Sequence, residues 1–559
     1  MPTRMKPEEA AAALKLVQEF GGVRAAARAS KIPHNTLLNR YHRALELGMA
    51  QEVEEKVHSR APAQPVIKGR VGILDRREFL LPAKGKIARH IFTCAQSNTY
   101  IHEPLWDNLL ALAKHYDATL HISTFTYDAA AYGPRAVKRG TSKTAGAEPW
   151  YDARVEPFID DSSAVVAPGL IWCGEMNILP TAVRPLSGLE SYTGRKSGIF
   201  PHVKIAMESI PSGKFEGTKF NYTTGTVTQR NYIQKKAGQK AEFHHGYGAL
   251  LVEVDSDGYW WCRQLNGDSE GTLYDLDVCA KGGEVTTGHR VKAIQWGDIH
   301  RRVISDEMMN LLWGAAPFGP ITVDNMLDTL RPEYQFMEDV LDFRPRNHHE
   351  MKNFHKMYAK WVRGQDDVFD ELLLTAQFLK TESKRDWCET VVVRSNHDAA
   401  FDRWLREADY KTDFKNARFF LKAQLAFLDA IHEGNDGFLP IEWACRELGV
   451  PEGVRFLRQD ESFIICPDAN GGIECGHHGD KGANGAKGSL SGFARTGRKV
   501  NIGDKHSAGI MDGAYLAGVA GDLDHDYNQG MSSWSNSHIC TYPNGKRCIV
   551  TVWKGKWRA

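Results

Sequence analysis

Several common signatures are missing from this sequence of 559 residues. Its ten cysteines include no Cys-x-x-Cys pair and no regular spacing, so we expect reduced thiols in a cytoplasmic protein. The sequence contains neither a signal-peptide hydrophobic region nor a long apolar run, so we expect neither export nor membrane insertion. It also lacks the Gly-x-x-x-x-Gly-Lys-Ser/Thr pattern, which argues against nucleotide hydrolysis of the P-loop kind.

The chain has almost no net charge either. It contains 70 Lys and Arg against 69 Asp and Glu, giving a formal charge of +1 and a pI near 7.7. The net charge is therefore too small to attract the whole chain to nucleic acid, and any DNA binding must come from local basic patches. Hydrophobic content of 42% and charged content of 25% describe a soluble globular protein, and the length suggests several domains.

The first 50 residues are expected to form a helical module. Apolar spacing predicts helices over Glu8–Phe20, Val23–Ala29 and His34–Leu47, with a turn at Ser30–Pro33. The pattern resembles a small helix-turn-helix of the phage and transposase type; the alternative is a helical hairpin for oligomerisation. The basic residues that a helix-turn-helix would offer to DNA phosphates are Arg24, Arg28, Lys31, Arg40 and Arg43.

Two segments lie between this module and the most informative half of the chain. Residues 51–84 have no periodicity and contain APAQP, so we expect a linker. Residues 85–290 have alternating α/β character, with a strand-helix-strand pattern over 88–125 and a hairpin turn at Asp257-Gly258. We expect a mixed α/β domain of unknown role there.

Metal-ligating residues follow strand-like runs in the second half of the chain. Thr390–Val393 is followed, after Arg394, by Ser395, Asn396, His397 and Asp398, and the carboxyl ends of strands are where α/β proteins keep their active sites. The other residues placed in this way are Asp298 and His300, Asp342, His477 and His478, and Asp504 and His506. Imidazole and carboxylate together suit Mn, Fe or Zn, and a carboxylate shared by two ions builds a two-metal phosphoester site.

The order of these motifs over residues 291–559 resembles the calcineurin-like metallophosphoesterases. That resemblance implies an α/β fold, a four-layer α/β/β/α sandwich, holding two divalent metal ions bridged by Asp342. It further implies that His397 donates a proton and stabilises the transition state, and that Asp398 keeps His397 oriented. The remaining ligands that it implies are Asp298, His300 and His506 for one ion, and Asn396 and His477 for the other.

The sequence departs from the family pattern at three places. Leu341 and Ser395 stand where the family has glycine, which leaves the ligand atoms in place. Asp504 replaces the first His of the family's Gly-His-x-His; a carboxylate still ligates, and it favours a harder ion such as Mn over Zn. Without Asp504 as a ligand, the second metal site would be weak or absent. His348-His349 is an alternative ligand pair.

A segment rich in glycine, lysine and histidine, Gly471–Gly513, adjoins these motifs. Its glycines let backbone come close to a ligand, and lysines such as Lys481 and Lys487 bring positive charge. Such a segment suits a polyanionic substrate, which favours a phosphodiester over a phosphomonoester as the substrate. The alternative is that the segment is a flexible surface loop.

Together, the features are most similar to the early nucleases with which tailed phages degrade host DNA, relatives of the double-strand-break repair nucleases. The likeness implies a Mn-dependent DNase, a symmetric homo-oligomer, acting on DNA in the cytoplasm of an infected bacterium. Two alternatives remain open. One is a small-molecule phosphodiesterase, for instance acting on cyclic nucleotides; the other is a non-catalytic DNA-binding protein with a degenerate site.

Overall fold

The computed structural model describes residues 7–20, 23–47, 49, 76–127, 149–213, 216–314, 324–469, 471–525 and 528–559. The chain divides into two compact units, residues 1–70 and 71–559. Most of the linker expected at 51–84 lies outside the described residues. Among those that are described, no helix has the length and apolar character needed to cross a membrane.

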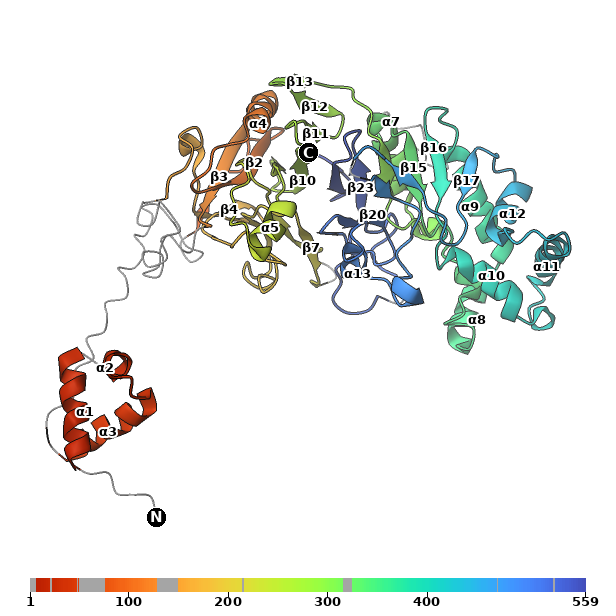
Figure 1. Ribbon diagram of the computed structural model, residues 1–559. Coiled ribbons are helices and arrows are strands. Elements are labelled where there is room, and N and C mark those ends of the chain that lie inside the picture. Colours follow the sequence, from red (N-terminus) through yellow and green to blue (C-terminus); the bar gives the residue numbers. More distant parts are fainter. Residues whose placement is uncertain are drawn as a thin grey trace, which may run out of the picture. The chain divides into compact units, whose positions relative to one another are not determined.

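The first unit is a group of three helices, α1 (Pro7–Phe20), α2 (Val23–Ser30) and α3 (His34–Glu46) (Figure 1). Small and aliphatic side chains at helical spacing on α1, including Ala10, Ala13 and Val17, are buried against the other two helices. The sequence therefore predicted these helices to within a residue or two. Docking on DNA as a helix-turn-helix stays a prediction.

In the second unit, a βαβ element begins a four-stranded sheet of order β10-β9-β2-β3. Strands β2 (Ile87–Gln96) and β3 (Ala118–Phe125) pair in parallel, and α4 (Glu103–Tyr116) connects them, as the sequence predicts. Strands β9 (Gly248–Asp255) and β10 (Trp260–Asn266) form the hairpin that turns at Asp257-Gly258.

A six-stranded sheet, in the part of the chain that the structure describes, has the order β17-β16-β15-β14-β23-β24. Its strands are β14 (Ala293–Gln295), β15 (Tyr334–Met337), β16 (Glu389–Val392), β17 (Val454–Phe456), β23 (Ser537–Thr541) and β24 (Arg547–Thr551). The first four run parallel, so their carboxyl ends meet at one edge. The last two form a hairpin around Asn544-Gly545, a dipeptide that favours tight hairpin turns.

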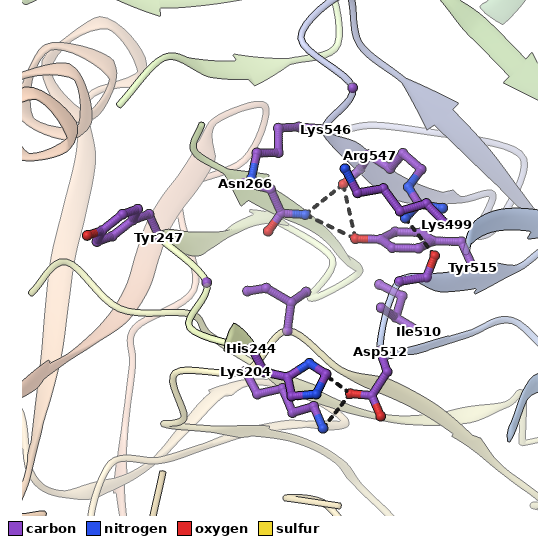
Figure 2. Close-up of a pocket in the computed structure, with 14 residues that line it drawn as sticks. Lys204, His244, Tyr247, Asn266, Lys499, Ile510, Asp512, Tyr515, Lys546 and Arg547 are labelled. Carbon is purple, nitrogen blue, oxygen red and sulfur yellow. Dashed lines mark hydrogen bonds and ion pairs between the residues drawn. The ribbon is translucent and has the colours of Figure 1, made fainter. Parts of the chain in front are cut away.

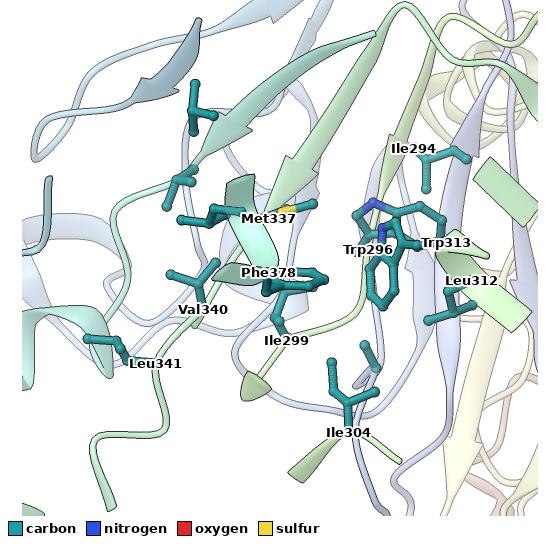
Figure 3. Packing of buried hydrophobic residues seen from close by; sticks show 14 of the residues in the cluster. Ile294, Trp296, Ile299, Ile304, Leu312, Trp313, Met337, Val340, Leu341 and Phe378 are labelled. Atoms are coloured by element: carbon teal, nitrogen blue, oxygen red, sulfur yellow. The ribbon is translucent and has the colours of Figure 1, made fainter. Parts of the chain in front are cut away.

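Side chains alternate between the two faces of this sheet. Ile294, Met337 and Val392 point into a core shared with a layer of helices, part of which Figure 3 shows around Trp296 and Trp313. The helices of that layer are α6 (Asp306–Trp313), α7 (Met326–Leu330), α9 (Val368–Glu382), α10 (Asp398–Glu407), α11 (Ala417–His432) and α12 (Pro440–Glu447). A further helix, α8 (Phe354–Val362), precedes α9.

The opposite face packs against a second, larger sheet. Phe336 and Val391 share a core with Ile465 and Ile473 of that sheet. Over the described residues it has eleven strands, in the order β1-β4-β5-β6-β8-β7-β21-β22-β20-β19-β18. They are β1 (Arg77–Glu78), β4 (Ser163–Ala167), β5 (Leu170–Cys173), β6 (Ser197–Phe200), β7 (Met207–Ile210), β8 (Lys219–Thr223), β18 (Ile464–Ile465), β19 (Ile473–Glu474), β20 (Lys499–Ile502), β21 (Gly509–Met511) and β22 (Ala514–Leu516).

The eleven-stranded sheet crosses the domain boundary that the sequence suggests. Met207 of β7 pairs with Ile510 of β21, so strands from 85–290 and from 291–559 share one sheet. The expected boundary at 290/291 therefore separates two segments whose strands belong to the same sheet. The sequence could not show this, because a pairing between strands far apart along the chain leaves no local pattern. Helix α13 (Leu490–Ala494) covers β20 and β22. The other α-helix and strands that the structure describes are α5 (Lys236–Phe243), β11 (Leu273–Asp275), β12 (Val278–Lys281) and β13 (Glu284–Thr286).

Candidate metal centre

Loops that follow five strands of the two packed sheets bring a set of histidines and carboxylates together. Strands β14, β15, β16, β19 and β20 each end shortly before one of these loops. The side chains that they supply are Asp298 and His300, Glu338 and Asp339, Asn396 and His397, His478, and Asp504 and His506. The strand-end placement that the sequence suggests is therefore observed.

A first group of donor atoms comprises Asp298, His300, Asp339 and His506, all of them buried. Nε2 of His506 lies 2.9 Å from Oδ2 of Asp298 and 3.2 Å from Nε2 of His300. Nε2 of His300 lies 3.7 Å from Oδ2 of Asp339. The spacing lets one cation contact all four side chains.

A second group surrounds the buried His478. Its Nε2 lies 2.9 Å from Oδ1 of Asn396, 3.3 Å from Oδ2 of Asp339 and 3.8 Å from Oδ1 of Asp504. Its Nδ1 lies 3.2 Å from Oε2 of Glu338. Asp339 therefore belongs to both groups, and Asp504 stands beside the second.

The carboxylate common to these two groups is Asp339 rather than the predicted Asp342. Asp342 belongs with His300 and His397 to a third group of possible metal donors, and its Oδ1 lies 3.4 Å from Nδ1 of His300. The reason is that β15 ends at Met337, so Asp339 emerges directly at the sheet edge, while the Asp342 backbone N–H donates to Glu371 of α9 at 3.0 Å. Similarly, His478 is buried in the cluster and its neighbour His477 is partly exposed.

His397 is held differently from the prediction. Its Nδ1 lies 3.0 Å from the backbone carbonyl of Asp342, to which it can donate. The carboxylate of Asp398, expected to orient His397, instead accepts from the Leu341 N–H at 3.0 Å. Asp398 thus ties the Asp342 loop to the start of α10, and the Asp342 carbonyl fixes the His397 ring.

The charge balance of the cluster fits a bound cation. Burial raises the pKa of Asp298 to about 7 and that of Glu338 to about 8, with neighbouring carboxylates adding to both shifts. Although burial alone lowers the pKa of His478, the Asp339, Glu338 and Asp298 carboxylates raise it well above its usual value. Divalent metal ions would supply the missing positive charge, so these residues can hold metal.

The backbone around the cluster is unusually constrained. His300, Asp339, Asp504 and His506 all have positive φ, between 42° and 72°. Such conformations cost free energy in residues other than glycine and gather at functional sites. At Gly503, an added Cβ would come within 2.2 Å of both Glu338 and Asp298 oxygens, so only glycine lets these carboxylates approach.

Sequence reasoning missed part of the site. It selected neither Glu338 nor Asp339, which stand in the same FMEDVLDF segment as Asp342, because no local pattern distinguishes these carboxylates. The buried ring of His525 lies 5.3 Å from that of His300, and Trp534 packs on His506 at 4.1 Å between ring centroids. The sequence around His525 carries no strand or motif signal that would have selected it.

The candidate DNA-binding residues whose partners the structure describes contact residues of their own unit. Arg40 lies 3.5 Å from Glu9, Arg43 lies 2.8 Å from Glu46, and Lys481 donates to Gln459 at 2.9 Å. Arg28, Lys31 and Lys487 are exposed, while the side chain of Arg24 falls outside the described residues. The alternative pair His348-His349 is exposed and belongs to neither donor group.

Comparison with known proteins gives one informative result. No family model and no solved structure matches the chain. Protein A1 of Escherichia phage T5 is 39% identical over 482 residues, which cover 84% of this chain and 83% of that protein. The chain belongs to the family of phage T5 Protein A1. Membership in this family agrees with the phage origin that the sequence suggests.

Proposed function

We propose that this member of the Protein A1 family is a metal-dependent DNA nuclease that hydrolyses phosphodiester bonds at a dinuclear centre. The observation that carries the proposal is the sharing of Asp339 by two donor groups at the carboxyl ends of parallel strands. A shared carboxylate between two cations is the arrangement that two-metal phosphoesterases use.

Each ion has its own ligand set. Asp298, His300 and His506 with Asp339 would hold one ion, and Asn396, His478 and Asp504 with Asp339 would hold the other. A mixture of carboxylate, amide and imidazole donors with an aspartate in place of a histidine favours Mn. Bound divalent ions supply Lewis acidity and a water of lowered pKa.

The protein's own contribution to the chemistry rests on His397. Because the Asp342 carbonyl engages Nδ1, the other ring nitrogen is left to give a proton to the departing oxygen. Its ring centroid lies 4.6 Å from that of His300, so it acts beside the first donor group. His397 is therefore assigned as the general acid, and Asp398 as a residue that positions the loop.

The fold supports the same assignment. The helix layer, the six-stranded sheet, strands β19, β20 and β22, and α13 follow one another as α, β, β and α. We infer that they form the sandwich of the calcineurin-like metallophosphoesterases. DNA is preferred as substrate because a separate basic helical unit precedes the centre, and phosphate contacts by Lys and Arg hold a polymer without reading its sequence.

The test is degradation of linear and closed-circular duplex DNA by the full chain with Mn, with Mg and with chelator. A His397→Ala variant is compared with His348→Ala, which removes an exposed histidine outside both donor groups. We expect metal-dependent loss of DNA that falls by at least about 100-fold in His397→Ala alone. Intact DNA together with hydrolysis of a cyclic nucleotide would replace the proposal with a small-molecule phosphodiesterase, and no turnover of either would leave a binding protein.

A further inference from the structure

A pocket of about 170 Å³ opens between strands from the two halves of the second unit (Figure 2). Asn266 of β10, Lys499 of β20, Tyr515 of β22 and Arg547 of β24 line it, and Nδ2 of Asn266 donates to the Tyr515 hydroxyl at 3.2 Å. Lys499 begins β20, whereas Asp504 and His506 follow its carboxyl end. The pocket is therefore separate from the candidate metal centre.

Positive charge dominates the pocket lining. Four cationic side chains, Lys204, Lys499, Lys546 and Arg547, face a single carboxylate, Asp512. That carboxylate already pairs with Lys204 and lies 3.4 Å from Nδ1 of His244. The remaining three cations therefore have no carboxylate of the lining to balance them.

These three cations are held by neutral groups. Arg547 is buried over the Tyr515 ring at 3.9 Å, and its guanidinium donates to the Val500 and Gly513 carbonyls at 2.9 and 2.7 Å. Lys499 donates to the Ala469 carbonyl at 2.7 Å. The ammonium of Lys546 has no hydrogen-bond or ion-pair partner within the described part of the chain.

The crowding of like charges is costly without an anion. Burial, together with the neighbouring Lys499 and Arg547, lowers the pKa of Lys546 to about 8. Burial and Arg547 also lower the pKa of Lys499. Asp268 acts on Lys546 from outside the lining, but its oxygens already accept from Thr272 N–H and from Asn544 Nδ2, both at 2.9 Å. An anion in the pocket would relieve this repulsion.

We propose that this pocket binds a phosphate group, with Lys499 and Lys546 as its direct contacts and Arg547 as a fixed charge behind them. The volume is smaller than that of pockets that enclose a whole drug-sized ligand, so it suits a phosphate attached to something larger that stays outside. That phosphate belongs either to a free nucleotide or to a DNA strand. The inference does not depend on the proposed nuclease activity.

The experiment is isothermal titration calorimetry on the full chain. The buffer contains a chelator, so that no metal ion is bound that could itself bind the phosphate of a probe. The probes are inorganic phosphate, a deoxynucleoside 5′-monophosphate and a short duplex with unphosphorylated ends. Wild type is compared with the double variant K499Q/K546Q, with the single variant K546Q, and with K281Q as a matched exposed lysine on β12. Circular-dichroism melting confirms that each variant is folded.

We expect binding that K499Q/K546Q weakens by at least roughly tenfold, with a smaller loss in K546Q and none in K281Q. A loss seen with phosphate and nucleotide assigns the pocket to free nucleotides, and a loss seen with the duplex alone assigns it to the DNA backbone. Equal affinities in wild type and both pocket variants, or no binding of any probe, would overturn the proposal.

Discussion

Asp339 is the single residue on which the candidate metal centre depends most, because its carboxylate lies in both donor groups. We predict that Asp339→Asn weakens metal binding by at least about 100-fold, while Asp342→Asn, which removes a carboxylate beside the His300 ring, weakens it by a smaller factor of about 10 to 100. The two variants are matched in chemistry and differ only in position. Metal content after dialysis, measured by inductively coupled plasma mass spectrometry, checks the prediction, and a greater loss in Asp342→Asn would return the bridging position to that residue.

At the residue scale, sequence patterns locate the motifs but not always the ligand. Asp298, His300 and His506 lie together as the motif order suggests. In FMEDVLDF, by contrast, both aspartates follow strand-like residues, and only the end of β15 at Met337 decides between them. His477 and His478 pose the same problem, since burial of one of two adjacent histidines depends on the packing of the two sheets.

At the scale of elements, helix α9 contains a buried acid, Glu382, that makes stability depend on pH. Burial raises its pKa from 4.5 to about 7, with Arg385 opposing the shift. Its contribution to stability is therefore complete below pH 4.5 and is lost as the pH rises through about 7. Between pH 5 and pH 8 the free energy of unfolding of the wild type should fall. We predict that it falls by less in Glu382→Gln, the difference being on the order of 1–3 kcal/mol.

Urea unfolding at both pH values measures this effect, with the exposed Glu389→Gln as control. An identical pH dependence in wild type and Glu382→Gln would show that the buried carboxyl does not cost stability when it ionises.

Local patterns predict most single elements of this fold. Helix α9 (Val368–Glu382) and the β23–β24 hairpin around Asn544-Gly545 are two examples. Both depend on neighbouring residues: apolar spacing in the helix and turn chemistry in the hairpin. The pairing of β7 with β21 joins Met207 to Ile510, which lie far apart along the chain, so no window of the sequence contains it.

For the whole molecule, the separation of residues 1–70 from 71–559 gives a direct prediction. Deleting residues 1–70 should leave metal content unchanged, because the donor residues all belong to the second unit. The deletion should weaken binding of long DNA. It should also reduce the slope of the logarithm of the binding constant against the logarithm of the salt concentration, by about 0.9 for each phosphate that the helical unit neutralises. Fluorescence anisotropy across a salt series measures both quantities.

An unchanged affinity and salt slope in the truncated chain would contradict DNA binding by the helical unit and favour its alternative role in oligomerisation. A homo-oligomer itself stays a prediction, and sedimentation velocity of the full chain tests it.

We propose that two ions share Asp339 and that hydrolysis of DNA requires both of them. The most direct test is titration of Mn into the chelator-stripped full chain, counting bound ions while following cleavage of closed-circular DNA. We expect two ions per chain, with cleavage rising as the second site fills. Binding of less than one ion per chain, with DNA left intact throughout, would contradict it and leave the chain a DNA-binding protein with a degenerate site.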